Sequence, residues 1–382
     1  MKNKLLIIFA FALVFMACEN QESDFPDFGS TSVYFPFQTP VRTLIQGKYD
    51  LGFNDNDNNG RFEIGVTMSG VYNNNIDRKV NFEVDTDIIN PTILGGISTN
   101  VVALPESYYT IEQESPLTIP AGSIKGRIPV QLTDAFFDDP LSFVAVNDSV
   151  NYVIPLKITN FVDLDSLLIG VPNEGIAEPK RVIANNWSIL PKDYTLFGIK
   201  FMNKYQGIYL RRGEDKVVGS TKVVKTGFVN SEDETVVDGS TVYRSEFVVR
   251  DEITSVSTAG RNKAISINSV RRPGIPSNSN VSLLLTFNDS EDITITSADE
   301  NSPFVVTGTG KFVENGDEWG GEKRDVIYLE YEYQDKVVEN TKENFNFTDV
   351  TSTIDLFHTV KDTLVIRDRD VKFEEFTFYL NE

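Results

Sequence analysis

Several kinds of residue are scarce in this 382-residue chain, and each scarcity excludes a class of function. A single cysteine and a single histidine exclude intrachain disulfides, most metal sites and every Ser-His or Cys-His catalytic pair that does not use His358. Bases number 35 against 56 acids, and the resulting net charge of −21 repels a phosphate backbone. We therefore expect no nucleic-acid partner.

Long apolar runs are also scarce, and the longest lies at the N-terminus. Two lysines precede an uninterrupted apolar run over residues 5–16, which is long enough for a signal peptide but too short for a transmembrane helix. Cys18 follows a small residue directly, as in a bacterial lipobox, although a plain signal peptide with an incidental cysteine is the alternative. The sequence predicts a signal peptide over 1–17, lipid attachment at Cys18 and a flexible tether over 18–30.

The remaining sequence has the pattern of a sheet-built soluble protein. Apolar residues recur at every second position, for example in 79–85 and 127–133, which indicates strands with one buried face. Short strands separated by Asn, Asp, Gly and Pro predict an immunoglobulin-like β-sandwich over 31–165. A linker over 166–180 then leads to 181–382, which we expect to form an antiparallel meander or a lipocalin-like β-barrel. The predicted fold class is all-β.

One acidic segment raises the question of a metal ion. Residues 55–60, with the sequence DNDNNG, match the first half of a calcium loop, in which oxygens of Asp55, Asp57 and Asn59 would converge on the ion. The bidentate Glu at position twelve is replaced by Val66. The same residues are typical of a hairpin loop. We therefore expect a loop and no cofactor, with calcium as the alternative.

Aromatic residues beside polar groups are the candidates for carbohydrate binding, because a sugar offers an apolar face ringed by hydroxyls. Trp319 lies in a polar, glycine-rich segment, where it either stays exposed or folds back over the barrel. Trp187 fits a core position as well as a site, and Tyr72 lies beside three asparagines in an expected hairpin tip. Tyr205 and Tyr209 either contribute to a site or build the barrel.

Three further features have structural interpretations. Arg211 and Arg212 either bind an acidic sugar or pair with nearby carboxylates. His358 is expected to be a packed or a surface histidine rather than a catalytic one. Residues 307–311, TGTGK, do not have the spacing of a phosphate loop. We expect a strand whose glycines make room for a neighbour.

The sequence also resembles two known domains. Residues 107–110, 117–123 and 128–132 resemble an N-terminal domain of unknown function found on Bacteroidota lipoproteins, which also precedes some glycoside hydrolase family 18 endoglycosidases. The segments similar to its usual C-terminal companion domain are 191–200, 205–213 and 362–369.

This resemblance implies a lipoprotein of a polysaccharide-utilisation locus, anchored in the outer membrane, facing the cell exterior and touching the membrane through its lipid only. The implied partners are a glycan or oligosaccharide, and an outer-membrane porin complex or glycoside hydrolase of the same locus. The Asp-x-x-Asp-x-Asp-x-Glu run of family 18 hydrolases is absent from the sequence, so we expect a non-catalytic protein, and a glycoside hydrolase is the least favoured alternative. The second hypothesis is a structural or adhesive lipoprotein that docks to another protein and exposes apolar patches or open strand edges.

Overall fold

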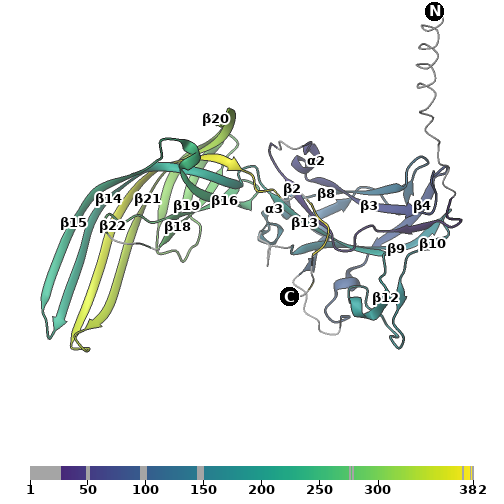
Figure 1. The fold of residues 1–382 in the computed structure, drawn as a ribbon, viewed down its shortest axis with the longest axis horizontal. Helices are drawn as coiled ribbons and strands as arrows, with labels where there is room; N and C mark the ends of the chain where they lie inside the picture. The colour runs from purple at the N-terminus through teal and green to yellow at the C-terminus, as the bar shows by residue number, and fades with distance from the viewer. Residues whose placement is uncertain are drawn as a thin grey trace, which may run out of the picture.

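The computed structural model describes residues 27–48, 52–94, 101–143, 150–274, 277, 279–371, 374–378 and 380. The predicted signal peptide, Cys18 and most of the tether lie outside these residues. Regular structure within them is almost entirely β, which confirms the all-β prediction. None of the helices in these ranges has the length and apolar character needed to cross a membrane. Figure 1 shows two lobes, joined near the label of β16.

The N-terminal lobe is a sandwich of two sheets. The first sheet, in spatial order, consists of β10 (Ser166–Leu167), β1 (Ser32–Tyr34), β3 (Arg61–Ser69), β8 (Lys125–Leu132) and β6 (Tyr109–Ile111). The second consists of β23 (Glu374–Glu375), β2 (Val41–Ile45), β13 (Tyr194–Met202), β9 (Tyr152–Val162), β4 (Arg78–Val84) and β7 (Leu117–Ile119), with β5 (Val102–Ala103) beside β9. Alternating side chains such as Ile64, Ile128 and Ile154 fill the core between the sheets.

Short elements connect these strands. They are α2 (Asp55–Asn58), η1 (Thr86–Ile89), η2 (Glu106–Tyr108), α3 (Asp134–Asp138), η3 (Pro140–Ser142), β11 (Val171–Pro172), η5 (Ala184–Asn186) and β12 (Trp187–Ile189). Some of them cover the outer face of the second sheet, where Val153 of β9 and Leu196 of β13 pack with Ile88. The first half of β9 is therefore buried on both faces, whereas the alternation predicted one wet face.

The boundary between the lobes differs from the predicted one. β13 lies in the segment 181–382 that we expected to be barrel, yet it pairs with β9 and β2 of the sandwich. β10, in the predicted linker 166–180, pairs with β1, and β23 returns from the end of the chain to pair with β2. The reason is that alternation indicates which face of a strand is buried but does not indicate which sheet the strand joins. The sandwich therefore extends to the end of β13.

The C-terminal lobe is a closed antiparallel barrel. Its strands, in order, are β14 (Gly207–Gly227), β16 (Glu252–Gly260), β17 (Lys263–Ser269), β18 (Asn280–Phe287), β19 (Asp292–Ser297), β20 (Val306–Trp319), β21 (Glu322–Glu343) and β22 (Thr348–Asp368). β22 pairs back with β14 and closes the barrel, so this part of the sheet has no free edge. Leu283, Leu329 and Val360 lie in the interior.

Four strands continue beyond the barrel as an arm. The strand order in the arm is β15 (Ser231–Tyr243), β14, β22, β21. The pairing of β22 with β21 continues as far as Glu343. Figure 1 shows this arm as a long curved sheet that runs away from the sandwich. Among the described residues, β15 and the distal part of β21 each have a strand partner on one side only. A short turn, η6 (Val248–Arg250), precedes β16.

Candidate functional site

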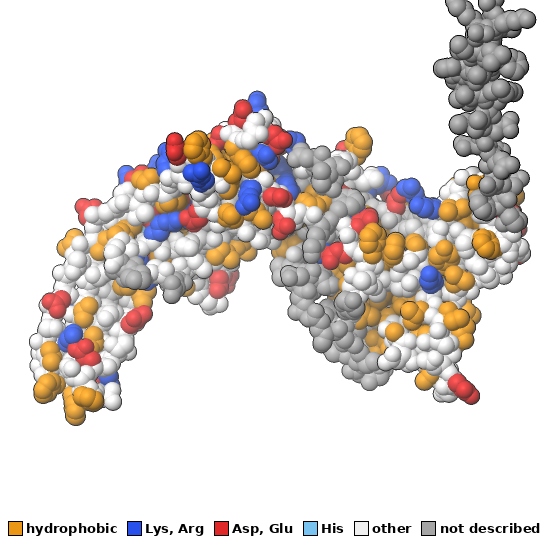
Figure 2. Space-filling model, viewed as in Figure 1, with side chains coloured by type: hydrophobic (Ala, Val, Ile, Leu, Met, Phe, Trp, Pro, Cys, Tyr) orange, Lys and Arg blue, Asp and Glu red, His pale blue; other side chains and the backbone are white. Residues whose placement is uncertain are grey.

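A cleft of about 690 Å³ lies where the barrel meets the sandwich. Its walls come from the β20–β21 hairpin, from the end of β22 with the residues after it, and from Lys48, which follows β2 in the sandwich. The space-filling view in Figure 2 shows charged side chains of both signs on the part of the barrel nearest the sandwich. Junctions between domains are common positions for ligand sites.

Trp319 supports one wall of this cleft. It is the last residue of β20, and Gly320 and Gly321 make the turn into β21 with φ of 65° and 79°, in the left-handed region that favours glycine. The indole Nε1 donates a hydrogen bond to the carbonyl of Ile366 at 3.2 Å, and the Arg324 guanidinium lies over the ring, 4.6 Å from its centroid. Ile366 and Arg324 both line the cleft. The half-buried indole therefore fixes the position of Arg324 at the wall of the cleft.

Positive side chains outnumber negative ones around the cleft. The lining bases are Lys48, Lys323, Arg324, Arg367 and Arg369, and the lining acids are Glu322, Asp325 and Asp368. This local excess of positive charge contrasts with the net charge of −21 of the whole chain. The cleft thus differs electrostatically from the protein that surrounds it.

The bases of the cleft differ in how they are paired. Arg324 donates to Glu322 at 2.6 Å, but its Nε is buried without an acceptor among the described residues. Arg369 is held by backbone carbonyls, including that of Lys204 at 2.7 Å. Within the part of the chain that the structure describes, the side chains of Lys323 and Arg367 make no hydrogen bond or ion pair, although both residues lie in paired strands. These two exposed cations, with Arg324, are the groups available to a ligand.

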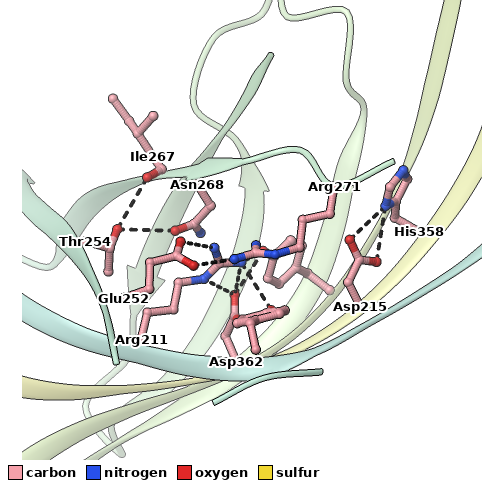
Figure 3. Close-up of polar contacts among 11 residues, drawn as sticks. Arg211, Asp215, Glu252, Thr254, Ile267, Asn268, Arg271, His358 and Asp362 are labelled. Atoms are coloured by element: carbon pink, nitrogen blue, oxygen red, sulfur yellow. Dashed lines mark hydrogen bonds and ion pairs between the residues drawn. The ribbon is translucent and has the colours of Figure 1, made fainter. Parts of the chain in front are cut away.

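A second polar cluster lies inside the barrel, at the end nearest the arm (Figure 3). Arg211 of β14 is only 2 % exposed and donates to Asp362 at 3.0 Å and to Glu252 at 3.0 Å. Burial alone would lower the pKa of Arg211, but the adjacent Asp362 carboxylate raises this pKa well above its ordinary value. Arg212 pairs with Asp251 at 2.5 Å. Both arginines therefore pair with local carboxylates, as one of the two interpretations of the sequence predicted.

His358 belongs to the same cluster. Its ring is fully buried and stacks on Tyr333, with centroids 4.4 Å apart. Nδ1 lies 3.0 Å from Asp215, as Figure 3 shows, and Nε2 lies 3.9 Å from Asp335, which in turn binds Arg272. Of the two expected positions, packed or surface, the packed one is observed. The bases of this cluster pair with carboxylates of the same cluster. We therefore interpret it as a structural network that stabilises the barrel wall.

The structure excludes two of the predicted carbohydrate-binding residues as surface platforms. Tyr205 and Tyr209 are 2 % and 0 % exposed in the barrel core. Tyr205 donates to Glu291 at 2.9 Å, and Tyr209 donates to the carbonyl of Tyr205 at 2.7 Å. Burial raises the pKa of both hydroxyls, and in Tyr205 the hydrogen bond to Glu291 raises it further. The alternative, in which these tyrosines build the barrel, is the one observed.

The remaining aromatic candidates lie apart from the cleft. Trp187 is half-buried in β12 and donates from Nε1 to the carbonyl of Lys180 at 2.9 Å. Tyr72 is 67 % exposed in the segment after β3. Neither residue lines the cleft. Trp319 does not line it either, but of the predicted aromatic set it is the one that contacts lining residues, Arg324 and Ile366.

The acidic segment forms a single helical turn, α2, rather than a hairpin loop. Asp57 is buried, where it accepts a hydrogen bond from Arg42 at 2.7 Å and from the amide of Ile45 at 3.0 Å. Asn59 donates to the carbonyl of Asp55 at 2.8 Å. The three side chains predicted as calcium ligands therefore do not converge, and the described residues contain no cluster of His, Cys, Asp or Glu arranged to hold a metal.

A groove of about 550 Å³ lies on the sandwich. It is flanked by Phe37 and Phe376, whose ring centroids are 5.0 Å apart. The lining arginines Arg61 and Arg127 are paired with glutamates, so this groove offers less unpaired charge than the cleft. Sequence reasoning missed it because its walls come from five distant segments.

Sequence reasoning also missed the charged residues of the cleft. The signal was present, because Trp319 is followed within a few residues by Lys323 and Arg324, and the last long strand ends near Arg367 and Arg369. What joins the two segments is the pairing of β21 with β22, which places Val326 opposite Val365. The spacing along the chain does not show that pairing.

Comparison with known proteins supports a chain built from two domains. Residues 204–370 match the family model of a domain of unknown function, DUF5627, and residues 28–162 match a second model that is described only as an N-terminal domain. No curated protein matches the chain.

Solved structures of similar fold come from Bacteroides. A structural-genomics protein of unknown function from Bacteroides ovatus is 29 % identical, with a TM-score of 0.72 over 92 % of this chain and 98 % of that one. A multidomain protein including DUF1735 from the same species is 13 % identical, with a TM-score of 0.40 over 89 % and 96 % of the two chains. An auxiliary nutrient binding protein from Bacteroides thetaiotaomicron is 14 % identical, with a TM-score of 0.36 over 85 % and 90 %. Similarity as low as in the last two carries no argument about this chain.

Proposed function

We propose that this chain is a cell-surface lipoprotein that binds glycans in the cleft beside Trp319, as a non-catalytic accessory of a polysaccharide-utilisation system. The observation that carries the proposal is the concentration of polar groups in that cleft. Guanidinium groups of Arg324 and Arg367, with Asn315 and Asp325, can bond the hydroxyls of a sugar from several sides. A volume of about 690 Å³ lies within the range of about 300–1,000 Å³ typical of ligand pockets.

The location is part of the same proposal. Lipidation of Cys18 would attach the chain to the outer membrane, with the sandwich and barrel outside the cell. Two or three acyl chains hold a soluble protein on a membrane durably, because each buried CH₂ contributes about 0.8 kcal/mol. In that position the protein would capture oligosaccharide and pass it to a porin complex or hydrolase of the same locus.

Two carboxylates of the cleft, Glu322 and Asp325, accept hydrogen bonds from other groups of the protein, which supports a non-catalytic role. Glu322 binds Arg324, and Asp325 accepts a hydrogen bond from the amide of Asn315 at 2.9 Å. A hydrolytic site needs one carboxyl group that can protonate the leaving oxygen and another that acts as a base or nucleophile. Neither of these two carboxylates has an environment that favours such a task.

A glycan array probed with the purified full-length protein in detergent tests the proposal. We expect retention of a defined set of oligosaccharides by the wild type. Trp319→Ala should bind about tenfold more weakly, because a cation–π contact that fixes Arg324 is lost. Trp319→Phe keeps a ring under Arg324 and should recover most of the affinity.

The control is Tyr328→Ala, which removes a 39 % exposed ring from the outside of the same barrel and should bind as the wild type does. A folded wild type that retains no glycan, or a Trp319→Ala variant with unchanged binding, contradicts the proposal.

The arm favours a second candidate function, docking to another protein. Its tip exposes Phe228, Phe345 and Phe347 by 80 %, 95 % and 69 %, and the amide of Phe228 donates to the carbonyl of Phe347 at 2.9 Å, so the two turns form one apolar surface. Phe345 is held at φ 55°, a left-handed conformation that a bulky residue rarely adopts. Exposed apolar tips and open strand edges are typical of interaction sites.

Site-specific photo-crosslinking in intact cells tests this second function. A crosslinking amino acid at position 345 should give one dominant protein adduct, whereas the same probe at Phe53, 97 % exposed on the sandwich, should give none. Equal labelling from both positions would show that the tip makes no specific contact.

A further inference from the structure

We infer that the cleft beside Trp319 selects anionic glycans, that is, sugars that carry a carboxylate or a sulfate. The inference rests on the proposed function, because it names the class of glycan for the same site. Its basis is the positive charge of Lys323 and Arg367, together with Arg324. A neutral sugar bound in the cleft would bring no counter-charge to these groups.

The rest of the barrel surface shows how bases are usually accommodated in this acidic chain. Lys311 pairs with Asp292 at 2.7 Å and Lys361 pairs with Glu330 at 2.9 Å, each across neighbouring strands. Lys323 and Arg367, by contrast, line one concavity and have no partner among the described residues, although acids outnumber bases 56 to 35. A free carboxylate or sulfate would supply the counter-charge that the protein does not.

Arg324 adds a directed donor to this charge. Trp319 covers one face of its guanidinium and Glu322 binds Nη2, so the group is held in place. Glu322 takes only Nη2, so the guanidinium keeps further N–H donors at the wall of the cleft, which Arg324 lines. An oxygen of a planar carboxylate or of a sulfate is the kind of acceptor that a guanidinium binds best.

The acids of the cleft complete the fit to a sugar acid rather than to a bare anion. Asp325 and Asp368 line the same walls as the three cations, and carboxylates accept hydrogen bonds from sugar hydroxyls. The two carboxylates would repel a free anion, which has no hydrogen-bond donor to offset the repulsion. An anionic sugar presents both a negative group and hydroxyl donors. The geometry therefore favours a charged saccharide over inorganic sulfate.

Matched probes separate charge from sugar recognition. We would measure dissociation constants of the full-length protein in detergent for galacturonate oligomers and their methyl esters, and for dextran sulfate and unsulfated dextran oligomers. We expect at least one acidic probe to bind about tenfold more tightly than its neutral counterpart, the size of effect that charge-assisted hydrogen bonds give. The pair that shows the difference identifies a carboxylate or a sulfate as the recognised group.

A double variant assigns the effect to the cleft. Lys323→Gln with Arg367→Gln should weaken binding of the acidic probe about tenfold, to the level of the neutral probe. The matched control, Lys216→Gln with Arg244→Gln, removes two exposed bases whose side chains likewise make no hydrogen bond or ion pair with described residues and that lie outside the cleft. This control should bind as the wild type does.

The outcomes distinguish this inference from the proposed function. Binding of neutral glycans that depends on Trp319 but does not change in the Lys323 and Arg367 double variant would overturn the inference and leave the proposed function standing. Binding of inorganic sulfate with the affinity of dextran sulfate would also overturn it, since no sugar would then be recognised. Failure of every glycan, acidic or neutral, would instead overturn the proposed function.

Discussion

Arg211 shows at the scale of one residue how this chain uses charge in its interior. The guanidinium and its partner Asp362 are both almost fully buried, so each compensates the other in a medium where an isolated charge is very unfavourable. The sequence presented Arg211 only as part of an arginine pair with two alternatives. Its partner lies on another strand 151 residues away, which is why sequence alone did not decide between them.

Removal of one member of this pair should be strongly destabilising. We expect Arg211→Met to lower the free energy of unfolding by about 3–5 kcal/mol, because it leaves the Asp362 carboxylate buried and unpaired. Urea unfolding of the full chain, followed by circular dichroism, measures this change. Arg127→Met is the control, since its pair with Glu63 is 67 % and 41 % exposed and should contribute less than about 1 kcal/mol. Equal losses in the two variants would contradict the account of the network.

Asp139 gives a pH-dependent prediction in the sandwich. Its carboxylate accepts hydrogen bonds from Tyr152 at 2.7 Å, the amide of Leu141 at 2.8 Å and Tyr108 at 2.9 Å. Burial opposes ionisation of this carboxyl, but the three hydrogen bonds together lower its pKa. The folded pKa lies below the unfolded value of about 3.9, so this stabilisation is present above that pH and is lost as the pH falls through the folded pKa.

Asp139→Asn should therefore lower the free energy of unfolding, measured in urea at pH 7, by about 1–2 kcal/mol. The difference in this free energy between the wild type and the variant should shrink toward pH 3. Asp138→Asn, at the exposed neighbouring position, is the control and should have little effect. A difference between wild type and Asp139→Asn that stays constant from pH 7 to pH 3 would show that the charge of Asp139 is not involved.

At the scale of the element, alternation predicted individual strands well and their neighbours poorly. Alternate apolar residues, such as Leu283 and Leu285 of β18 and Leu329 and Tyr331 of β21, lie in the barrel interior. The pairing of β14 with β22 selects the barrel from the two alternatives, meander or barrel, that the sequence left open. The transfer of β13 to the sandwich was not predictable. A strand pattern specifies which side is buried, whereas the partner is chosen by packing between segments far apart in the chain.

The glycines of β20 give a prediction at the same scale. Gly308 lies opposite Tyr331 of β21, and a Cβ at this position would collide with the Glu330 carbonyl and with Tyr331. The sequence predicted glycines that make room for a neighbour, and the structure confirms it. Gly308→Ala should destabilise the chain by about 1–3 kcal/mol in urea unfolding, because the backbone has to shift.

Gly65 of β3 is the matched control, since a Cβ there would meet nothing within 4 Å. Gly65→Ala should change stability by less than about 0.5–1 kcal/mol, and any change should be stabilising because the unfolded chain loses freedom. If Gly308→Ala is tolerated as well as Gly65→Ala, the close approach of β20 and β21 is not as described.

At the scale of the whole molecule, Arg369 links the two lobes. Its guanidinium donates to the carbonyl of Gln46 in the sandwich at 3.2 Å and to those of Asn203 and Lys204 at the start of the barrel. Because Arg369 also lines the cleft, the shape of the cleft depends on this link. The site is thus a property of two domains together, which explains why inspection of either domain's sequence did not reveal it.

Arg369→Gln should loosen the junction. We expect a broader distribution of distances between spin labels at positions 53 and 305, one on each lobe, and weaker glycan binding. Arg367→Gln is the control for the distances, because Arg367 lines the cleft but its side chain makes no hydrogen bond or ion pair with a described residue of the sandwich. Unchanged distances in Arg369→Gln would show that other contacts hold the lobes together.

The most direct test of the central claim is a crystal structure of the protein with the oligosaccharide that it retains most strongly on the array. The account predicts sugar density at the junction of barrel and sandwich, in hydrogen-bond contact with Arg324 and Arg367. Density in the groove between Phe37 and Phe376, or on the arm, with the cleft empty, would contradict it.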